Sequence, residues 1–232
     1  MEATEDLFTP IHKALRSMIY ALGSRLQTND FSDRPATTAL VADLEHDFAI
    51  ARSAGCVLCV LHYHAEEEEN VVFPPVTGVD GPLIRTLIAE HQDLTRREIA
   101  LGRSAHELLG MADPTARIRA GGQLNQSAND LFAAYLVHMN REENELVPLM
   151  RRSFTNEQMA AMRGKIIGAM PPDRLFAILG WMLPALNVQE LTELFLGLQK
   201  GAPPEAVKAI AQLGAAKVDP DRWKAMAAQV GL

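Results

Sequence analysis

The chain of 232 residues is long enough to bury a substantial core, and its 48% apolar and 22% charged residues are typical of a soluble globular protein. A net charge of −7 argues against nucleic acid as the main partner, because nucleic-acid-binding proteins usually carry a basic face. The sequence has no apolar run as long as a membrane span, and its acidic start, MEATEDLF, does not resemble a secretory signal, so we expect a cytoplasmic protein without a membrane partner.

Helix signals dominate the first two thirds of the chain, where Pro and Gly cluster at only a few breaks and β-branched alternation is scarce. Thr9-Pro10 predicts an N-cap followed by proline in the first helical turn, and Asp113 is expected to cap a later helix. Gly55 is a candidate bend, and Pro74-Pro75 is expected to end the second helix. Together these signals predict four long helices, over about 9–27, 35–72, 82–109 and 114–150.

Short helices are predicted for the remainder of the chain. Thr155–Gln158 and Asn187–Glu190 have the pattern of helix-capping boxes, while Pro203-Pro204 and Asp219-Pro220 are typical of helix starts. This segment is rich in Leu and Met, whose apolar surface must be covered. We expect it to pack on the preceding helices, to form a homodimer contact, or to be a separate helical module. The predicted division is therefore a four-helix domain over 1–153 and a C-terminal helical extension over 154–232.

The two cysteines, Cys56 and Cys59, are separated by two residues within a predicted helix. A CxxC pair can be a redox pair or half of a zinc site. A four-cysteine site is excluded because the chain has no other cysteine. The favoured interpretation is that both are small, buried, apolar residues.

One pattern of eleven residues occurs twice, as HAEEEENVVFP from His64 and as HMNREENELVP from His138. In each copy a glutamate, Glu68 or Glu142, follows the histidine by four residues. Residues with that spacing lie on one face of a helix, one turn apart. Each copy therefore directs an imidazole and a carboxylate toward one place.

Each copy is preceded by another helical histidine at a similar distance, His12 before the first and His91 before the second. If the helices pair as a pseudo-twofold bundle, both sets meet in its core. Four imidazoles and two carboxylates suit divalent iron, manganese or zinc. If each carboxylate bridges two ions, each ion keeps open positions for water or a small ligand such as a diatomic gas or peroxide. The predicted metal ligands are His12, His64, Glu68, His91, His138 and Glu142.

Other polar residues fit that set less well. Glu67 could replace Glu68, but the second copy has Arg141 at the same offset, so Glu67 and Glu69 are interpreted as flanking acids, either solvated or hydrogen-bonded to the ligands. Tyr20 and Tyr135 could approach the metals, although both fit better as core aromatics. His46, His62 and His106 are expected to be ordinary surface or partly buried histidines, and Arg16 to pair with a flanking acid.

From about Phe8 to Arg152 the chain resembles the hemerythrin-like family, also called the HHE cation-binding domain, on His12, both repeat copies and Glu90-His91. The resemblance implies an all-α, up-down four-helix bundle around a non-heme di-iron centre with an oxo or hydroxo bridge. It implies four histidines as terminal ligands and Glu68 and Glu142 as bridges. Oxygen-carrying members have a further histidine where this chain has Leu87 or Thr95, and a last carboxylate one position later.

These departures favour a protein that binds or senses dioxygen, nitric oxide, peroxide or iron over a simple oxygen carrier. The alternative is a di-iron oxidoreductase with catalase-like or oxygen-activating activity at the same centre. No positioned acid, base or substrate pocket can be identified from the sequence, so the choice between enzyme and sensor stays open.

Overall fold

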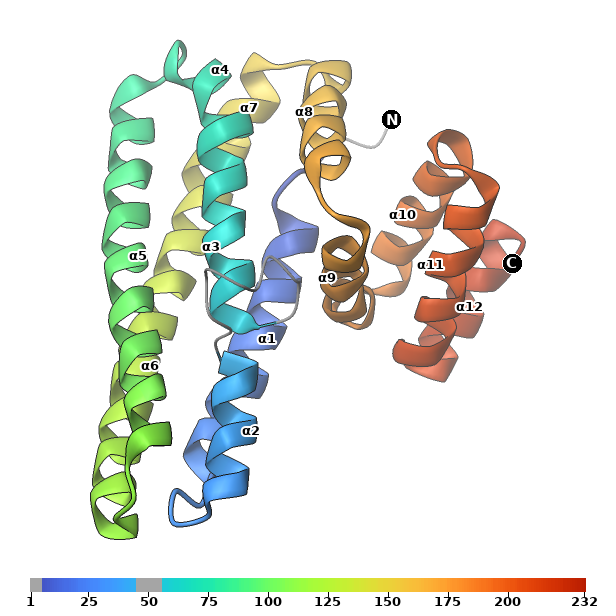
Figure 1. Ribbon diagram of the computed structural model, residues 1–232. Helices are drawn as coiled ribbons and strands as arrows, with labels where there is room; N and C mark the ends of the chain where they lie inside the picture. The colour runs from blue at the N-terminus through green and yellow to red at the C-terminus, as the bar shows by residue number, and fades with distance from the viewer. Residues whose placement is uncertain (1–5, 45–55) are drawn as a thin grey trace.

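The computed structural model describes residues 6–44 and 56–232, and all of its regular elements in those ranges are helical (Figure 1). The predicted all-α class is therefore confirmed. The elements of the first part are α1 (Thr9–Thr28), α2 (Arg34–Leu44), α3 (Val57–Glu67), η1 (Glu68–Val72), α4 (Phe73–Thr77), α5 (Gly81–Gly110), α6 (Pro114–Arg141), η2 (Glu142–Leu146) and α7 (Val147–Ser153). The expected bend at Gly55 lies outside the described residues, as does His46.

Four columns of helix form an up-down bundle, as predicted: α1, then α2 with α3, then α5, then α6 continuing into α7 (Figure 1). α1 packs on α3 and α6, and α5 packs on α6 and on α2 with α3. Fully buried side chains such as Leu15, Leu58 and Leu101 fill the space between the columns. Burial of this apolar core is the main stabilising term for the bundle.

Each repeat copy contains a π-helical turn, which begins at the glutamate four residues after the histidine. This glutamate is Glu68 in η1 and Glu142 in η2. Proline cannot donate a backbone hydrogen bond, and its ring collides with the carbonyl four residues earlier in an α-helix. In the wider turn, the N–H of Phe73 bonds to the carbonyl of Glu68, which lets the helix pass Pro74. The expected end of the second helix at Pro74-Pro75 is therefore wrong, because α4 continues to Thr77.

The predicted helix starts are mostly confirmed, with one correction. Asp113 accepts hydrogen bonds from the first backbone N–H groups of α6, as expected. Thr9, however, is inside α1 and its side chain caps nothing. Asp6 supplies the acceptor instead, because its Oδ1 bonds to the backbone N–H groups of Phe8 and Thr9 at 3.0 and 2.9 Å.

The C-terminal part consists of five helices among the described residues: α8 (Asn156–Ala169), α9 (Pro172–Ala185), α10 (Val188–Gly201), α11 (Pro204–Lys217) and α12 (Pro220–Val230). Both predicted capping boxes, at Thr155 and Asn187, are confirmed. α9 lies along α1 and contributes Ile178 to the core of the bundle, while α10 to α12 pack on α9 and on one another around Phe195 (Figure 1). Within the described ranges, no helix combines the length and apolarity needed to cross a membrane.

Cys56 and Cys59 are both buried at the start of α3, as expected, but they form a disulfide with each other. The burial that the favoured interpretation predicts is confirmed, while the disulfide is consistent with the alternative of a redox pair and excludes half of a zinc site for the bonded pair. Three residues of separation place both sulfur atoms on one side of the first helical turn, where the Sγ of Cys56 also accepts the N–H of Cys59.

Candidate metal centre

The structure brings the six predicted ligands together in the middle of the bundle. Each column contributes: α1 carries one, α3 with η1 carries two, α5 carries one, and α6 with η2 carries two. All are buried, with side chains turned inward to one another, although histidine and glutamate are seldom fully buried. The members of this set are His12, His64, Glu68, His91, His138 and Glu142.

The ligand atoms form two overlapping groups, in each of which one donor atom per residue lies within 4.8 Å of the others. One group contains His12 and His64, and the other contains His91 and His138. Glu68 and Glu142 belong to both. This is the donor arrangement that two neighbouring cations would require if they shared a pair of carboxylates.

Each shared carboxylate directs one oxygen toward each group. The Oε1 of Glu68 lies 3.0 Å from the Nε2 of His64, and its Oε2 lies 3.3 Å from the Nε2 of His91. Glu142 is arranged in the same way, with the Nε2 atoms of His138 and His12 each 3.3 Å from a different carboxylate oxygen. Each of the two carboxylates therefore faces a histidine of both groups.

Several of these buried atoms have no hydrogen-bond partner. They include both oxygens of Glu68 and of Glu142, and the Nε2 atoms of His12 and His64. The Nε2 atoms of His91 and His138 lie 2.8 Å apart, a separation that two lone pairs tolerate only with a proton or a cation between them. Burying polar and charged atoms without partners costs roughly several kcal/mol. Bound cations would supply the missing partners, so the donor set fits a metal site.

Three of the histidines are oriented from behind by a carboxylate. The Nδ1 atoms of His12, His91 and His138 lie 2.9, 2.9 and 2.8 Å from oxygens of Glu143, Glu69 and Glu90 respectively. Such a hydrogen bond fixes the ring orientation and presents the Nε2 lone pair to a metal.

The acids behind these rings were only partly predictable. Glu69 was among the flanking acids, whereas Glu143 and Glu90 were not identified as partners of the ligands. The signal was present in the repeat, because a second glutamate follows Glu68 and Glu142 directly in both copies. In each copy this second acid reaches a histidine on another helix, His91 from Glu69 and His12 from Glu143.

The fourth histidine, His64, breaks this pattern. Glu90 directly precedes His91 and holds His138; the equivalent position before His12 is Ile11, which cannot accept a hydrogen bond. Among the described residues, no carboxylate lies within ion-pair distance of the Nδ1 of His64. We call the three places where a carboxylate holds the Nδ1 of a histidine the acidic corners of the site. We call the fourth place, at His64, the apolar corner.

The carboxylates strongly affect the protonation of the metal-free site. Burial lowers the pKa of His12, but the neighbouring carboxylates of Glu142 and Glu143 outweigh it and raise the pKa to about 9. Burial also lowers the pKa of His138, but the carboxylate of Glu142 outweighs this effect and raises the pKa to about 9. Below that pH both rings carry protons that a binding cation must displace, so cation binding releases protons and strengthens as the pH rises toward 9.

The acid behind His12 is also held by Arg16. The Nη1 of Arg16 donates to the Oε1 of Glu143 at 2.7 Å, which confirms the predicted pairing of this arginine with a flanking acid. The hydrogen bond from His12, followed by that from Arg16, lowers the pKa of Glu143 to about 2 despite partial burial. Glu143 is thus ionised at physiological pH and orients His12 as an anion.

The two candidate tyrosines differ. Tyr20 is 59% exposed, so its expected place in the core is wrong. Tyr135 is buried as expected, and its hydroxyl donates to Glu98, a fully buried carboxylate that the sequence did not single out. Burial, and then the charge of Glu98, raise the pKa of Tyr135 well above its ordinary value, so it remains a proton donor.

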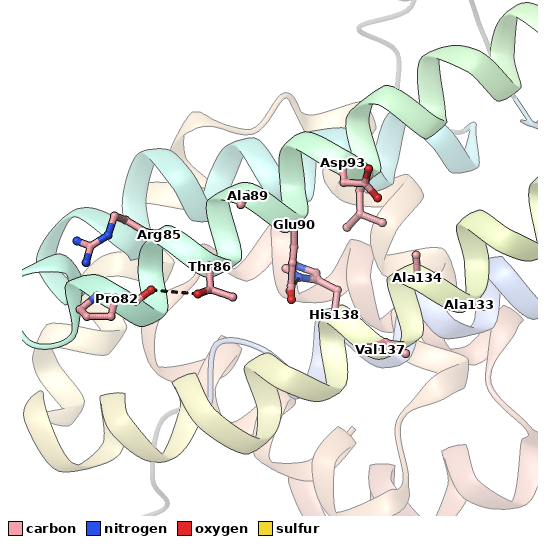
Figure 2. A pocket seen from close by; sticks show the side chains of 11 residues that line it. Pro82, Arg85, Thr86, Ala89, Glu90, Asp93, Ala133, Ala134, Val137 and His138 are labelled. Atoms are coloured by element: carbon pink, nitrogen blue, oxygen red, sulfur yellow. Dashed lines mark hydrogen bonds and ion pairs between the residues drawn. The ribbon is translucent and has the colours of Figure 1, made fainter.

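The site approaches the surface at the acidic corners. A groove between α5 and α6 is lined by Glu90 and His138, and its walls carry Thr86, Ala89 and Val137 (Figure 2). A second groove, lined by Glu69 and His91, lies between α3 and α5. Solvent therefore reaches the partly exposed acids behind these histidines, Glu69 and Glu90, while the histidines themselves are buried.

Residues 4–150 match the family model described as the hemerythrin HHE cation binding domain. The matched range runs from the start of the bundle into α7 and includes every candidate ligand. No curated protein and no solved structure matched the chain. Helices α8 to α12 lie outside the matched range.

Proposed function

The chain belongs to the hemerythrin HHE cation-binding domain family, and from this premise we propose that its bundle holds a non-heme di-iron centre that binds or senses a small oxidant or gas. One ion would take two imidazoles from the N-terminal half of the bundle and the other two from the C-terminal half. Glu68 and Glu142 would bridge them. The proposed terminal ligands are His12 and His64 on one ion, and His91 and His138 on the other.

The observation that carries this proposal is the membership of both carboxylates in both histidine groups. A single-metal site has no use for a second histidine pair on the far side of the same carboxylates. Imidazole and carboxylate donors accept iron, manganese or zinc, and the family resemblance favours iron. A pair of ferrous ions with open positions supplies the electrons for reversible binding or reduction of dioxygen, nitric oxide or peroxide.

The protein's own residues set the conditions around such a centre. The buried core excludes bulk water from the Nε2 side of the ligands, and the acids behind His12, His91 and His138 hold the rings in place. Tyr135 and Glu98 form a buried hydrogen bond on the inner faces of α6 and α5. The acids that line the two grooves beside the site, Glu69 and Glu90, are hydrogen-bonded to His91 and His138, which favours binding or sensing over turnover.

We also propose the two-part organisation, with a metal-binding domain over 1–153 and an extension over 154–232. The net charge of −7 supports a protein that does not bind nucleic acid, and the cytoplasmic location stays a prediction. A homodimer through the C-terminal helices stays a prediction.

Gas and peroxide chemistry distinguish the two functional candidates. Iron-loaded protein is reduced without oxygen and then mixed with dioxygen or with peroxide, while its visible absorbance and the dissolved oxygen are followed. Binding or sensing predicts a spectral change that reverses when the gas is removed, with no sustained turnover. Continuous oxygen evolution from peroxide would instead assign the oxidoreductase function to the same centre, and absence of any spectral response would contradict both.

A further inference from the structure

A partly enclosed cavity of about 220 Å³ lies between the bundle and the C-terminal extension. Its walls come from α1, α3 and η1 on the bundle side, and from α8, α9, α10 and α11 on the extension side. Figure 1 shows α8 and α9 beside the bundle, with α10 and α11 beyond α9. Two of the candidate metal ligands, His64 and Glu68, are part of the wall. The extension therefore encloses a space that reaches the apolar corner of the metal site.

The cavity is lined mainly by aliphatic and methionine side chains, among them Ile11, Ile166, Met182, Leu194, Leu198 and Ile210. Besides the candidate ligands, three charged residues line the cavity, Asp6, Glu67 and Arg163, and each of them interacts with another residue. Glu67 forms an ion pair with Arg174, and Asp6 bonds to Arg151 as well as to the start of α1. A cavity of this composition has little to offer water or a charged ligand.

The apolar surroundings extend to His64, the candidate metal ligand at this end of the cavity. Behind the other three histidines stands a carboxylate, but at this corner Ile11 occupies the corresponding position and also lines the cavity. His64 thus presents its ring to an apolar space. His64 and Glu68 form a polar end of the wall, and their unpartnered atoms, the Nε2 of His64 and both oxygens of Glu68, face the candidate metal site.

We propose that this cavity is a binding site for a small, uncharged, mainly apolar molecule, which lies between the extension and the bundle with one end against His64 and Glu68. An apolar cavity of about 150 Å³ is large enough for benzene, so this larger space fits a two-ring aromatic or a short aliphatic chain. The site goes beyond the proposed metal function, because the walls that bind the apolar part need no metal.

The test is a titration of the full-length protein with 1-aminonaphthalene, an uncharged two-ring fluorophore whose emission shifts to shorter wavelength in apolar surroundings. One saturable site per chain is expected, in metal-loaded and in metal-free protein alike. Leu198→Trp, which fills the cavity from α10, should weaken binding at least tenfold. Ile166→Trp should do the same from α8.

Leu196→Trp is the matched control, because Leu196 is on the same helix as Leu198 but is 41% exposed and does not line the cavity. It should bind the fluorophore like the unmodified chain, and helical circular dichroism should show that all three variants are folded. No saturable binding to the unmodified chain would overturn the proposal. Equal binding by all three variants would also overturn it. Loss of metal binding with normal fluorophore binding would contradict the proposed function alone.

Discussion

Glu68→Ala and Glu142→Ala are each expected to remove at least one of the two metal ions that we propose for the folded chain. Each carboxylate belongs to both histidine groups, so its loss removes one oxygen donor from each ion at once. The remaining three donors of each group are neutral imidazoles and one shared acid, which hold a divalent cation less tightly. The measurement is the metal-to-protein ratio after reconstitution with iron and gel filtration.

Glu66→Ala provides the matched control for this pair. Glu66 is two residues before Glu68, its side chain is 52% exposed, and it interacts with His62 rather than with any candidate ligand. This variant should keep the metal content of the unmodified chain. If Glu68→Ala or Glu142→Ala retains both ions, the assignment of the bridging residues is wrong; if Glu66→Ala also loses metal, the loss reflects damage to the helix.

Gly121→Ala is expected to destabilise the bundle by about 1–3 kcal/mol, the usual cost of forcing an extra methyl group into a packed core. A Cβ at this position of α6 would lie 2.2 Å from the Cγ of Phe31, well inside van der Waals contact. The ring cannot easily withdraw, because it is buried and because Arg117 holds the carbonyls of Phe31 and Ser32. Urea unfolding of the metal-free protein, followed by circular dichroism, measures the loss.

The neighbouring Gly122→Ala separates this contact from helix propensity. A Cβ at Gly122 would meet nothing within 4 Å, so alanine should leave the free energy of unfolding unchanged or raise it by about 0.5–1 kcal/mol, the usual gain in a helix. A Gly121→Ala variant as stable as Gly122→Ala would mean that Phe31 does not pack against α6 as described.

The helix signals and the family resemblance predicted the four-helix bundle, and the repeated histidine–glutamate spacing predicted the ligand pairs that meet in its core. Helical periodicity acts within one chain segment, so His64 and Glu68 could be placed on one face without knowledge of their neighbours. The similar position of His12 and His91 before each copy then predicted the pairing of helical hairpins, and the structure has all four columns in that arrangement.

The remaining features depend on contacts between segments that are distant in sequence. Glu143 reaches His12 and Glu90 reaches His138 across the bundle, and neither partnership follows from spacing along one helix. The passage of the second helix beyond Pro74 depends on a π turn, which local propensity does not specify. The apolar cavity exists only because α8 to α11 fold back onto the bundle, and the composition of those helices does not determine where they dock.

Anomalous diffraction at the iron absorption edge, from crystals of the iron-loaded protein, tests the central claim most directly. We expect two peaks inside the bundle, one beside His12 and His64 and the other beside His91 and His138, with a carboxylate oxygen of Glu68 and of Glu142 at bonding distance from each. A single peak, or peaks located away from these side chains, would contradict the account.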